Sequence, residues 1–332
     1  MLERDKLKPI GVTEEYTKLV EKETERINSL FKSESSNKIK KCEICGCNNL
    51  KNEFSKLGFS HMKCLNCEFI FVNPKPTAKL LKFYYENSIS SKFFQEKIIE
   101  PTREYRLNKI VKPRAEWLNS FFDNPGNYLD IGCSTGMLLE SMKKLKWNCQ
   151  GSEFSQDAIK IAKQHGLNVS NADLNNTKIF QKNSFDLITL FEVLEHVSDI
   201  SDLLSNIKNL LKKEGLLIIT IPNINGIEYR LMKENHENII PPAHINYFSK
   251  KSFNIIAEKF NFKIEKISTP GKLDVSNMIE AINEKRIDNT KDKIFIELIK
   301  RCEKDKTLME KLQELISNSG FSGHMAVIFK KI

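Results

Sequence analysis

Short apolar runs alternate with amphipathic segments along the C-terminal two-thirds of the chain, from about residue 127 onward. This alternation predicts a parallel α/β sheet covered by helices. The expected strands are 128–131, 148–152, 167–169, 185–191 and 216–221, and the expected helices are 137–146, 155–165 and 200–212. A late apolar pair, 262–267 and 325–329, is placed to close the sheet.

The N-terminal third has a different pattern. Apolar residues at near-helical spacing over 12–32 predict an exposed leading helix, and the polar stretch 33–41 is typical of a linker. A cysteine-rich module follows, and after it an aromatic and basic helical segment. We therefore expect a leading helix and linker (1–40), a zinc ribbon (41–76), a helical connector (77–126) and an α/β domain (127–332) with a helical insertion at 273–317.

The composition is that of an ordinary globular protein. Of 332 residues, 40% are hydrophobic and 29% are charged, which excludes collagen-like, low-complexity and wholly disordered chains. No apolar run approaches the ~20 residues of a membrane helix, and the charged start MLERDKLK lacks the features of a signal peptide. These observations favour a cytoplasmic protein. The net charge is +9, but no run of five basic residues occurs, which argues against a nucleic-acid partner.

Five of the eight cysteines lie within one short stretch of the N-terminal third. Four of them form two CxxC pairs separated by 18 residues, the spacing of a structural zinc ribbon. The expected zinc ligands are Cys42, Cys45, Cys64 and Cys67. Cys47 and His61 are competing ligands, but Cys47 breaks the spacing, and four thiolates leave no vacancy for His61. Without an export signal, such clustering indicates metal before disulfides.

A glycine turn follows the first expected strand, in the stretch Tyr128-Leu-Asp130-Ile-Gly132-Cys-Ser-Thr-Gly136. Its spacing is not that of the GxGxxG dinucleotide motif, and the GK[ST] of a phosphate loop is absent. The stretch resembles the first motif of the class I S-adenosylmethionine-dependent methyltransferases. The resemblance continues in register through the four following strands, to about residue 223. It implies an α/β fold with a Rossmann-like seven-stranded methyltransferase sheet and S-adenosylmethionine as cofactor.

The same resemblance implies a set of cofactor-binding residues at the strand ends. They are Asp130, Gly132, Cys133, Ser134, Gly136, Glu153, Phe154, Ala172, Asp173, Leu174, Phe191 and Glu192. The two glycines allow the backbone to approach the methionine end of the cofactor. Asp130 can hold the ammonium group, and Glu153 as a carboxylate is an acceptor that suits two ribose hydroxyls. Asp173 lies where family members contact the adenine.

The resemblance narrows further in two places. The cysteine pairs and the segment to residue 76 are similar to the front end of methyltransferases from sugar and surface-polysaccharide pathways, as is a Gly-His-Met stretch at 323–325. In that group the first His of a His-x-x-Tyr-Phe-Ser motif is a base candidate, and here the motif holds His244 and Tyr247. Carbon-methylating members have Tyr where this chain has Pro241, so the departure favours a hydroxyl acceptor. We expect His244 to be the general base and Tyr247 to line the acceptor pocket.

A second histidine lies in Glu192-Val-Leu-Glu195-His196. On a helical turn these two carboxylates and the imidazole share one face. Quinone-pathway O-methyltransferases have a similar string that binds a divalent cation, although the string is common across class I enzymes. Three roles stay open for it: an orienting role, a base in His196, and a metal site.

These features together predict an O-methyltransferase that acts on a hydroxyl of a sugar, either nucleotide-linked or a surface-glycan precursor. The basic charge suits a phosphate-bearing acceptor, which Lys272 or the segment of Arg103 and Arg106 would meet. The alternatives are an RNA or quinone-type small-molecule methyltransferase, and a noncatalytic zinc scaffold that binds the cofactor. Against the RNA alternative, the Asn-Pro-Pro-Tyr and catalytic-cysteine motifs of base-methylating enzymes are missing.

Overall fold

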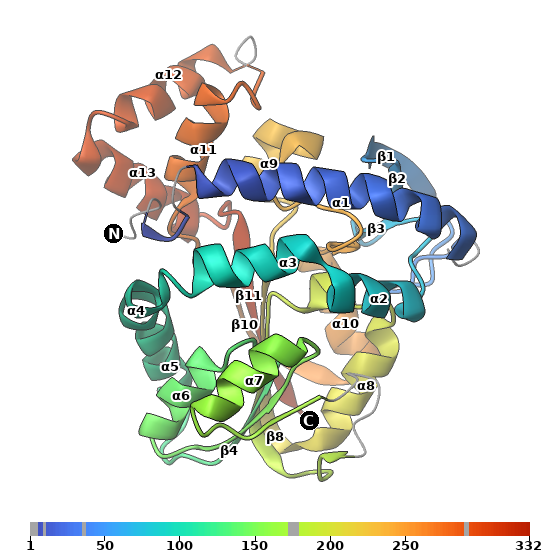
Figure 1. The fold of residues 1–332 in the computed structure, drawn as a ribbon, viewed down its shortest axis with the longest axis vertical. Coiled ribbons are helices and arrows are strands. Elements are labelled where there is room, and N and C mark those ends of the chain that lie inside the picture. Colours follow the sequence, from blue (N-terminus) through green and yellow to red (C-terminus); the bar gives the residue numbers. More distant parts are fainter. Residues whose placement is uncertain (1–5, 9–10, 35–37, 172–178, 289–291) are drawn as a thin grey trace.

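The computed structural model describes residues 6–8, 11–34, 38–171, 179–288 and 292–332 (Figure 1). Its larger sheet has seven strands in the order β10-β11-β8-β7-β4-β5-β6. They are β4 (Asn127–Ile131), β5 (Asn148–Ser152), β6 (Val169–Ser170), β7 (Phe185–Phe191), β8 (Leu211–Pro222), β10 (Phe262–Ser268) and β11 (His324–Lys331). Neighbours from β6 to β8 are parallel, whereas β11 is antiparallel to both β8 and β10. The predicted α/β class and seven-stranded sheet are confirmed.

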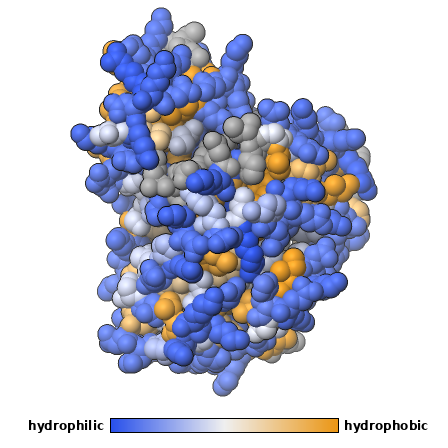
Figure 2. All heavy atoms as spheres, turned by 60° about the vertical axis from the view of Figure 1, so that its left-hand side comes forward, coloured by the Kyte–Doolittle hydropathy of each residue, from blue (hydrophilic) through white to orange (hydrophobic). Residues whose placement is uncertain are grey.

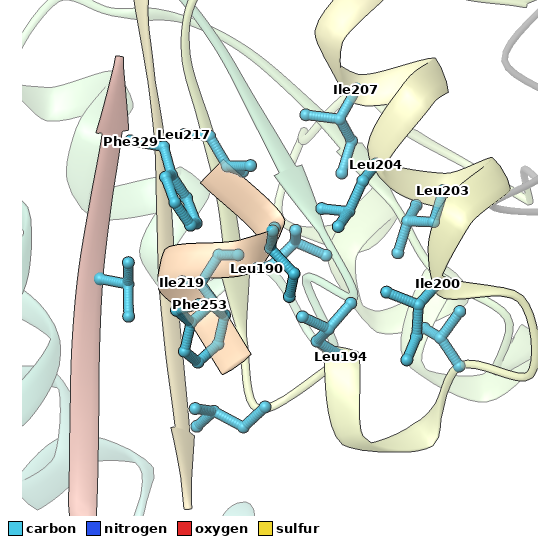
Figure 3. Packing of buried hydrophobic residues seen from close by; sticks show 14 of the residues in the cluster. Leu190, Leu194, Ile200, Leu203, Leu204, Ile207, Leu217, Ile219, Phe253 and Phe329 are labelled. Atoms are coloured by element: carbon cyan, nitrogen blue, oxygen red, sulfur yellow. The ribbon is translucent and has the colours of Figure 1, made fainter. Parts of the chain in front are cut away.

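Four helices lie between strands of this sheet along the chain, namely α6 (Met137–Lys144), α7 (Gln156–Gln164), α8 (Ile200–Leu210) and α10 (Lys250–Phe260). Ser155 and Asp199 begin α7 and α8 by accepting a hydrogen bond from a backbone N–H of the first turn. Figure 3 shows the apolar face of α8, with Leu203, Leu204 and Ile207, turned toward Leu190 of β7. All four side chains are fully buried, so this face fixes α8 on the sheet.

The observed β8 is longer than expected, because α8 ends at Leu210 rather than at residue 212. Leu211 pairs with Phe185 of β7 and is fully buried, so tertiary burial extends the strand at the helix's expense. The expected strands 148–152 and 185–191 match the observed ones, and the others apart from β8 differ by one or two residues at their ends.

A smaller antiparallel sheet has the order β1-β2-β3-β9. Its first three strands come from the cysteine module: β1 (Leu50–Lys56), β2 (Phe59–Cys64) and β3 (Ile70–Val72). The fourth, β9 (Asn246–Tyr247), comes from the segment directly after His244, more than 170 residues later. The cysteine module and the expected catalytic loop therefore belong to one sheet, which the local pattern of either segment did not indicate.

The leading helix α1 (Val12–Glu34) forms as predicted, but the expectation that it is exposed is wrong. It runs across the molecule beside α2 (Ala78–Asn87) and α3 (Ile89–Phe93) (Figure 1). One face is buried, with Val20, Thr24, Ile27 and Phe31. Thr24 also donates to the carbonyl of Pro241 at 3.3 Å, so the helix covers the loop that precedes His244.

The connector continues through η2 (Phe94–Ile99), α4 (Arg103–Arg106), η3 (Leu107–Val111) and α5 (Lys112–Asn119). Between β10 and β11 lie α11 (Asp274–Asn283), α12 (Lys293–Cys302) and α13 (Lys306–Asn318), which bury an apolar cluster of their own together with Met232 of α9 (Ile227–Met232). The face in Figure 2 is mostly hydrophilic, with hydrophobic side chains in small separate patches. No helix in the described part of the chain is long and apolar enough to cross a membrane.

Candidate active site and metal centre

The four expected cysteines converge on one point. Their sulfur atoms all lie within 4.8 Å of one another, with Cys42 and Cys67 at 3.4 Å and Cys45 and Cys64 at 3.5 Å. Four thiolates around zinc at about 2.3 Å lie roughly 3.8 Å apart, so the sulfur atoms need little movement to take up the ion. The Cys67 contact lowers the pKa of Cys42 to about 6, which favours a thiolate. This donor set fits a closed structural zinc site.

The two competing ligands lie elsewhere. The Cys47 sulfur accepts a hydrogen bond from the backbone of Asn49 at 3.4 Å. The His61 ring is buried and stacks on Phe54 with ring centroids 4.4 Å apart. Neither side chain belongs to the cluster of four.

Hydrogen bonds connect the cysteine module to the loop that carries His244. The Ser249 hydroxyl donates to the carbonyl of Cys67 at 3.0 Å, and the backbone N–H of Val72 donates to the carbonyl of Ile245 at 2.9 Å. Ile245 in turn donates its N–H to the carbonyl of Glu195 at 2.9 Å. A loss of order in the metal module would therefore reach both histidines of the candidate active site.

The glycine turn lies between β4 and α6, with Gly132 at φ +72° and Gly136 at φ +79°. A Cβ on Gly132 would overlap the Val193 side chain, and one on Gly136 would overlap Leu167. The protein's own packing therefore requires both glycines, in addition to any approach by a cofactor. The Cys133 side chain is buried in the core, which leaves only its backbone at the turn.

Glu153 bridges the two loops at the carboxyl ends of β4 and β5. Its Oε2 accepts the N–H of Ser134 at 2.8 Å, and its Oε1 accepts the N–H of Phe154 at 2.8 Å and of Ser155 at 2.9 Å. A carboxylate offers about four acceptor positions, so Oε2 keeps one for a ribose hydroxyl. The arrangement leaves room for one of the two ribose hydroxyls expected at Glu153.

Asp130 is a buried carboxyl group at the end of β4. It accepts a hydrogen bond from Thr189 at 2.6 Å, and burial raises its pKa to about 7. The guanidinium of Arg114 interacts with Asp130 and lies 4.6 Å from the centroid of the Phe191 ring. Asp130 can thus meet an ammonium group and Arg114 a carboxylate, the two charges of an amino-acid end. Sequence analysis missed Arg114, because α5 carries no motif that marks it.

Two histidine rings meet beside this edge of the sheet, with centroids 4.7 Å apart. The Nδ1 of His196 lies 2.8 Å from the carbonyl of Ala243 and 2.8 Å from the Tyr85 hydroxyl, and the Nδ1 of His244 lies 2.7 Å from the carbonyl of Asn238. A carbonyl only accepts, so Nδ1 of His244 carries a proton and its neutral ring has an acceptor at Nε2. Burial lowers the pKa of His244 to about 3 and lowers that of His196.

Tyr247 holds this loop in place. Its hydroxyl donates to the carbonyl of His244 at 2.9 Å, and the side chain is buried. This geometry supports a positioning role. Tyr85, from α2, was not expected at the site, because only the tertiary fold brings it to His196.

The Glu192-Val-Leu-Glu195-His196 string does not form the expected single face. Glu192 has φ +57°, and the 3-10 turn η5 (Leu194–His196) begins only after it. Glu195, His196 and His244 place ligand atoms within 4.8 Å of one another, while Glu192 points to Thr220 and His324 instead. Burial and the Glu192 charge raise the pKa of Glu195 well above its ordinary value, which favours its protonated form.

The arginines expected to meet a phosphate are engaged with the protein itself. Arg103 donates to Thr135 at 3.2 Å and to Glu140 at 3.2 Å. Arg106 donates to the carbonyl of Leu7 at 2.8 Å and to Thr102 at 2.7 Å. Three expected cofactor contacts, Ala172, Asp173 and Leu174, lie outside the described residues.

A seven-stranded sheet with a glycine turn after its first strand and acidic groups at two strand ends defines a class, the S-adenosylmethionine-dependent methyltransferases. A comparison with protein families finds a methyltransferase domain over residues 101–267, half of the chain. The chain belongs to this methyltransferase family.

Curated relatives agree with the family. A ubiquinone biosynthesis O-methyltransferase from Glaesserella parasuis is 33% identical over 161 residues, which cover 40% of this chain and 68% of the relative. One from Paraburkholderia phymatum is 32% identical over 182 residues, covering 48% and 78%. A solved methyltransferase from Archaeoglobus fulgidus aligns with 69% of this chain and 99% of its own at 21% identity, with a TM-score of 0.49.

We expect Glu153→Ala to weaken S-adenosylmethionine binding by about 10- to 100-fold, the loss of one charge-assisted hydrogen bond to the ribose. Calorimetry on the purified protein measures this, with Asp157→Asn, an exposed acidic residue of α7, as the matched control. An unchanged affinity in Glu153→Ala would refute the ribose role.

Cofactor affinity should also depend on the ionisation of Asp130. With a pKa of about 7, the carboxyl loses its charge as the pH falls, and only the charged form attracts an ammonium group. We expect the affinity for S-adenosylmethionine to rise about 10-fold from about pH 6 to pH 8. Titration of Asp130→Asn in parallel subtracts the ionisation of the ligand, and an equal pH dependence in both proteins would contradict the assignment.

Proposed function

We propose that this methyltransferase transfers a methyl group from S-adenosylmethionine to a hydroxyl of a sugar, either nucleotide-linked or a surface-glycan precursor. The observation that carries the transfer to oxygen is the protonation state of His244. Its Nδ1–H is committed to the carbonyl of Asn238, which leaves the Nε2 lone pair to accept a proton. Burial lowers the pKa of the ring to about 3, so this lone pair is unprotonated near neutral pH, and as a weak base it takes the acceptor proton only as the new bond to oxygen forms. A hydroxyl is a weak nucleophile until a base takes its proton, so transfer to oxygen near neutral pH calls for such a group.

Each protein group has a defined task in this proposal. Asp130 and Arg114 bind the two charges of the amino-acid end of the cofactor, and Glu153 accepts from its ribose. S-adenosylmethionine supplies a methyl group already activated by its sulfonium. His244 takes the acceptor proton on Nε2, and His196 and Tyr85 fix the loop on which it lies. Positioning and base catalysis supply the rate.

Zinc in the four-cysteine cluster is the structural part of the proposal. The cluster has four protein donors and therefore offers no position for a catalytic water. We assign it to holding β3 against β9, and through β9 the position of His244.

The choice of a sugar rests on the combination of the cysteine module with the His244 motif, and Pro241 in place of tyrosine favours oxygen over carbon. A phenolic ring is the second candidate, because the relatives reported above are named ubiquinone biosynthesis O-methyltransferases. Either acceptor presents a hydroxyl to the same base.

The deciding experiment incubates purified protein with S-adenosylmethionine and two panels, nucleotide sugars and catechols, and follows the gain of one methyl group by mass spectrometry. A methylated sugar supports the proposal, and a methylated catechol supports the second candidate. If neither panel yields product although the cofactor binds, the sugar proposal fails and the cofactor-binding scaffold takes precedence.

A further inference from the structure

His324 and Glu192 form an ion pair at the ligand-binding edge of the large sheet. Glu192 follows the carboxyl end of β7, the edge where parallel α/β sheets bind their ligands. His324 begins β11, and because β11 is antiparallel, its first residue lies at the same edge, opposite Pro222 of β8. The Nε2 of His324 lies 3.2 Å from Oε2 of Glu192, and Thr220 donates to the other carboxylate oxygen at 2.9 Å.

The turn that presents His324 is held from the inserted helices. The buried carboxylate of Asp274, at the start of α11, accepts from the Ser322 hydroxyl, the N–H of Gly323 and the side chain of Gln313. Gly323 also accepts the N–H of Asn223 at 2.8 Å, which ties the turn to the end of β8. The position of His324 is therefore fixed, although its side chain is 47% exposed.

Three carboxyl groups surround the His324 ring: Glu192 after β7, Glu228 on α9 and Asp274 on α11. Partial desolvation of the half-exposed ring opposes the charged form, but these groups, with Glu192 first, raise the pKa of His324 to about 9. The ring is thus an imidazolium at neutral pH, and its Nε2–H donates to the Glu192 carboxylate. No hydrogen bond within the described part of the chain engages the second donor, Nδ1–H.

An anionic acceptor at this edge would need a cation to bind it. Arg103 and Arg106 are bonded to the protein, and Arg114 lies over Phe191 beside Asp130. Glu192 also influences His244 electrostatically, which places His324 and the candidate base around one carboxylate.

We propose that His324 is an acceptor-binding residue, whose Nδ1–H donates to an anionic oxygen, a phosphate or carboxylate, on the molecule that receives the methyl group. Glu192 fixes the orientation of the ring through Nε2. This inference rests on the proposed function and adds a substrate class to it. The acceptor is a negatively charged hydroxyl compound, and one molecule of it would present its hydroxyl to His244 and its charge to His324.

A binding experiment tests the residue without any turnover. The full chain, with histidines labelled at Cε1, is saturated with S-adenosylhomocysteine and titrated by NMR with inorganic phosphate, with acetate, and with methyl glucoside at constant ionic strength. The His324 signal is assigned by its loss in His324→Gln. We expect a saturable shift of this signal with phosphate or acetate, whichever matches the acceptor, and none with methyl glucoside.

Two variants sharpen the result. Glu192→Gln should weaken the anion response, because the ring loses its charge partner, and His165→Gln, on an exposed helix end, should preserve it. If no anion shifts the His324 signal, or if the neutral glucoside shifts it equally, the inference is overturned.

The kinetic arm uses matched acceptors, namely sugar phosphates against methyl glycosides and uronates against their parent sugars. We expect His324→Gln to raise KM for the charged member by about 10- to 100-fold and to leave cofactor affinity unchanged. An equal rise for both members of a pair would mark a merely structural residue. Absence of any sugar turnover would count against the proposed function alone, since the NMR titration judges His324 independently.

Discussion

Cys64→Ser will release the metal from the N-terminal module and reduce methyl transfer to background. Cys64 is fully buried, so the substitution removes one of four ligands and leaves an unpaired hydroxyl in the core. Because metal affinity in such sites is folding free energy, we expect the melting temperature to fall by on the order of 10 °C. Metal analysis, thermal unfolding and turnover measure the three effects.

Activity is expected to fall because the cysteine module is hydrogen-bonded to the loop that carries His244. The Cys67 carbonyl accepts from Ser249, and β3 pairs with β9 through Ile70 and Tyr247. The matched control is Cys47→Ser, a partly buried cysteine of the same module that lies outside the cluster, which should keep metal and activity. Full turnover in metal-free Cys64→Ser would show that the module does not hold the His244 loop.

The large sheet could be predicted because each of its strands and helices is marked by a pattern within its own segment of the sequence. Each strand is a short apolar run, and each helix repeats its apolar residues with the helical period, so burial on the two faces follows from the sequence. β9 was not predictable, since two residues, Asn246 and Tyr247, become a strand only by pairing with β3. The exposure of α1 was misjudged for the same reason: its apolar stripe shows that something covers it and does not identify what does.

The candidate site likewise contains residues that sequence motifs indicated and residues that they did not. Asp130, Glu153 and His244 lie in motifs whose spacing is fixed by a strand and a turn, so sequence analysis located them. Arg114, Tyr85 and His324 reach the site from α5, α2 and the last strand, and tertiary contacts alone bring them there.

The protonation of the histidines was also beyond the sequence. An unperturbed histidine titrates at roughly pH 6.5, the range that suits a general base, and the sequence therefore indicated His244 for that role. Burial lowers its pKa to about 3, whereas the carboxyl groups around His324 raise that residue to about 9. The same side chain is thus a proton acceptor at one point of the edge and a cation at another, and only the surroundings decide which.

His244→Gln is expected to lower turnover by about 10²- to 10⁴-fold, the range for loss of a general base, with cofactor affinity near that of the wild type. With a pKa of about 3, His244 stays neutral from about pH 5 upward, so its ionisation should impose no acid limb on the rate there. Stopped assays across pH and calorimetry with S-adenosylmethionine measure both quantities, and His165→Gln serves as the control.

The same burial makes a stability prediction with a definite sign. The unfolded chain protonates His244 near pH 6.5 and the folded protein only near pH 3, so the unfolded state binds more protons between these values. The contribution of His244 to stability is therefore complete above about pH 6.5 and is lost as the pH falls toward 3, and His244→Gln removes this dependence. If the variant instead lost turnover and cofactor affinity equally, His244 would be a structural residue and the base would lie elsewhere, with His196 as the next candidate. If the variant kept the wild-type acid sensitivity of stability, another group would be its cause.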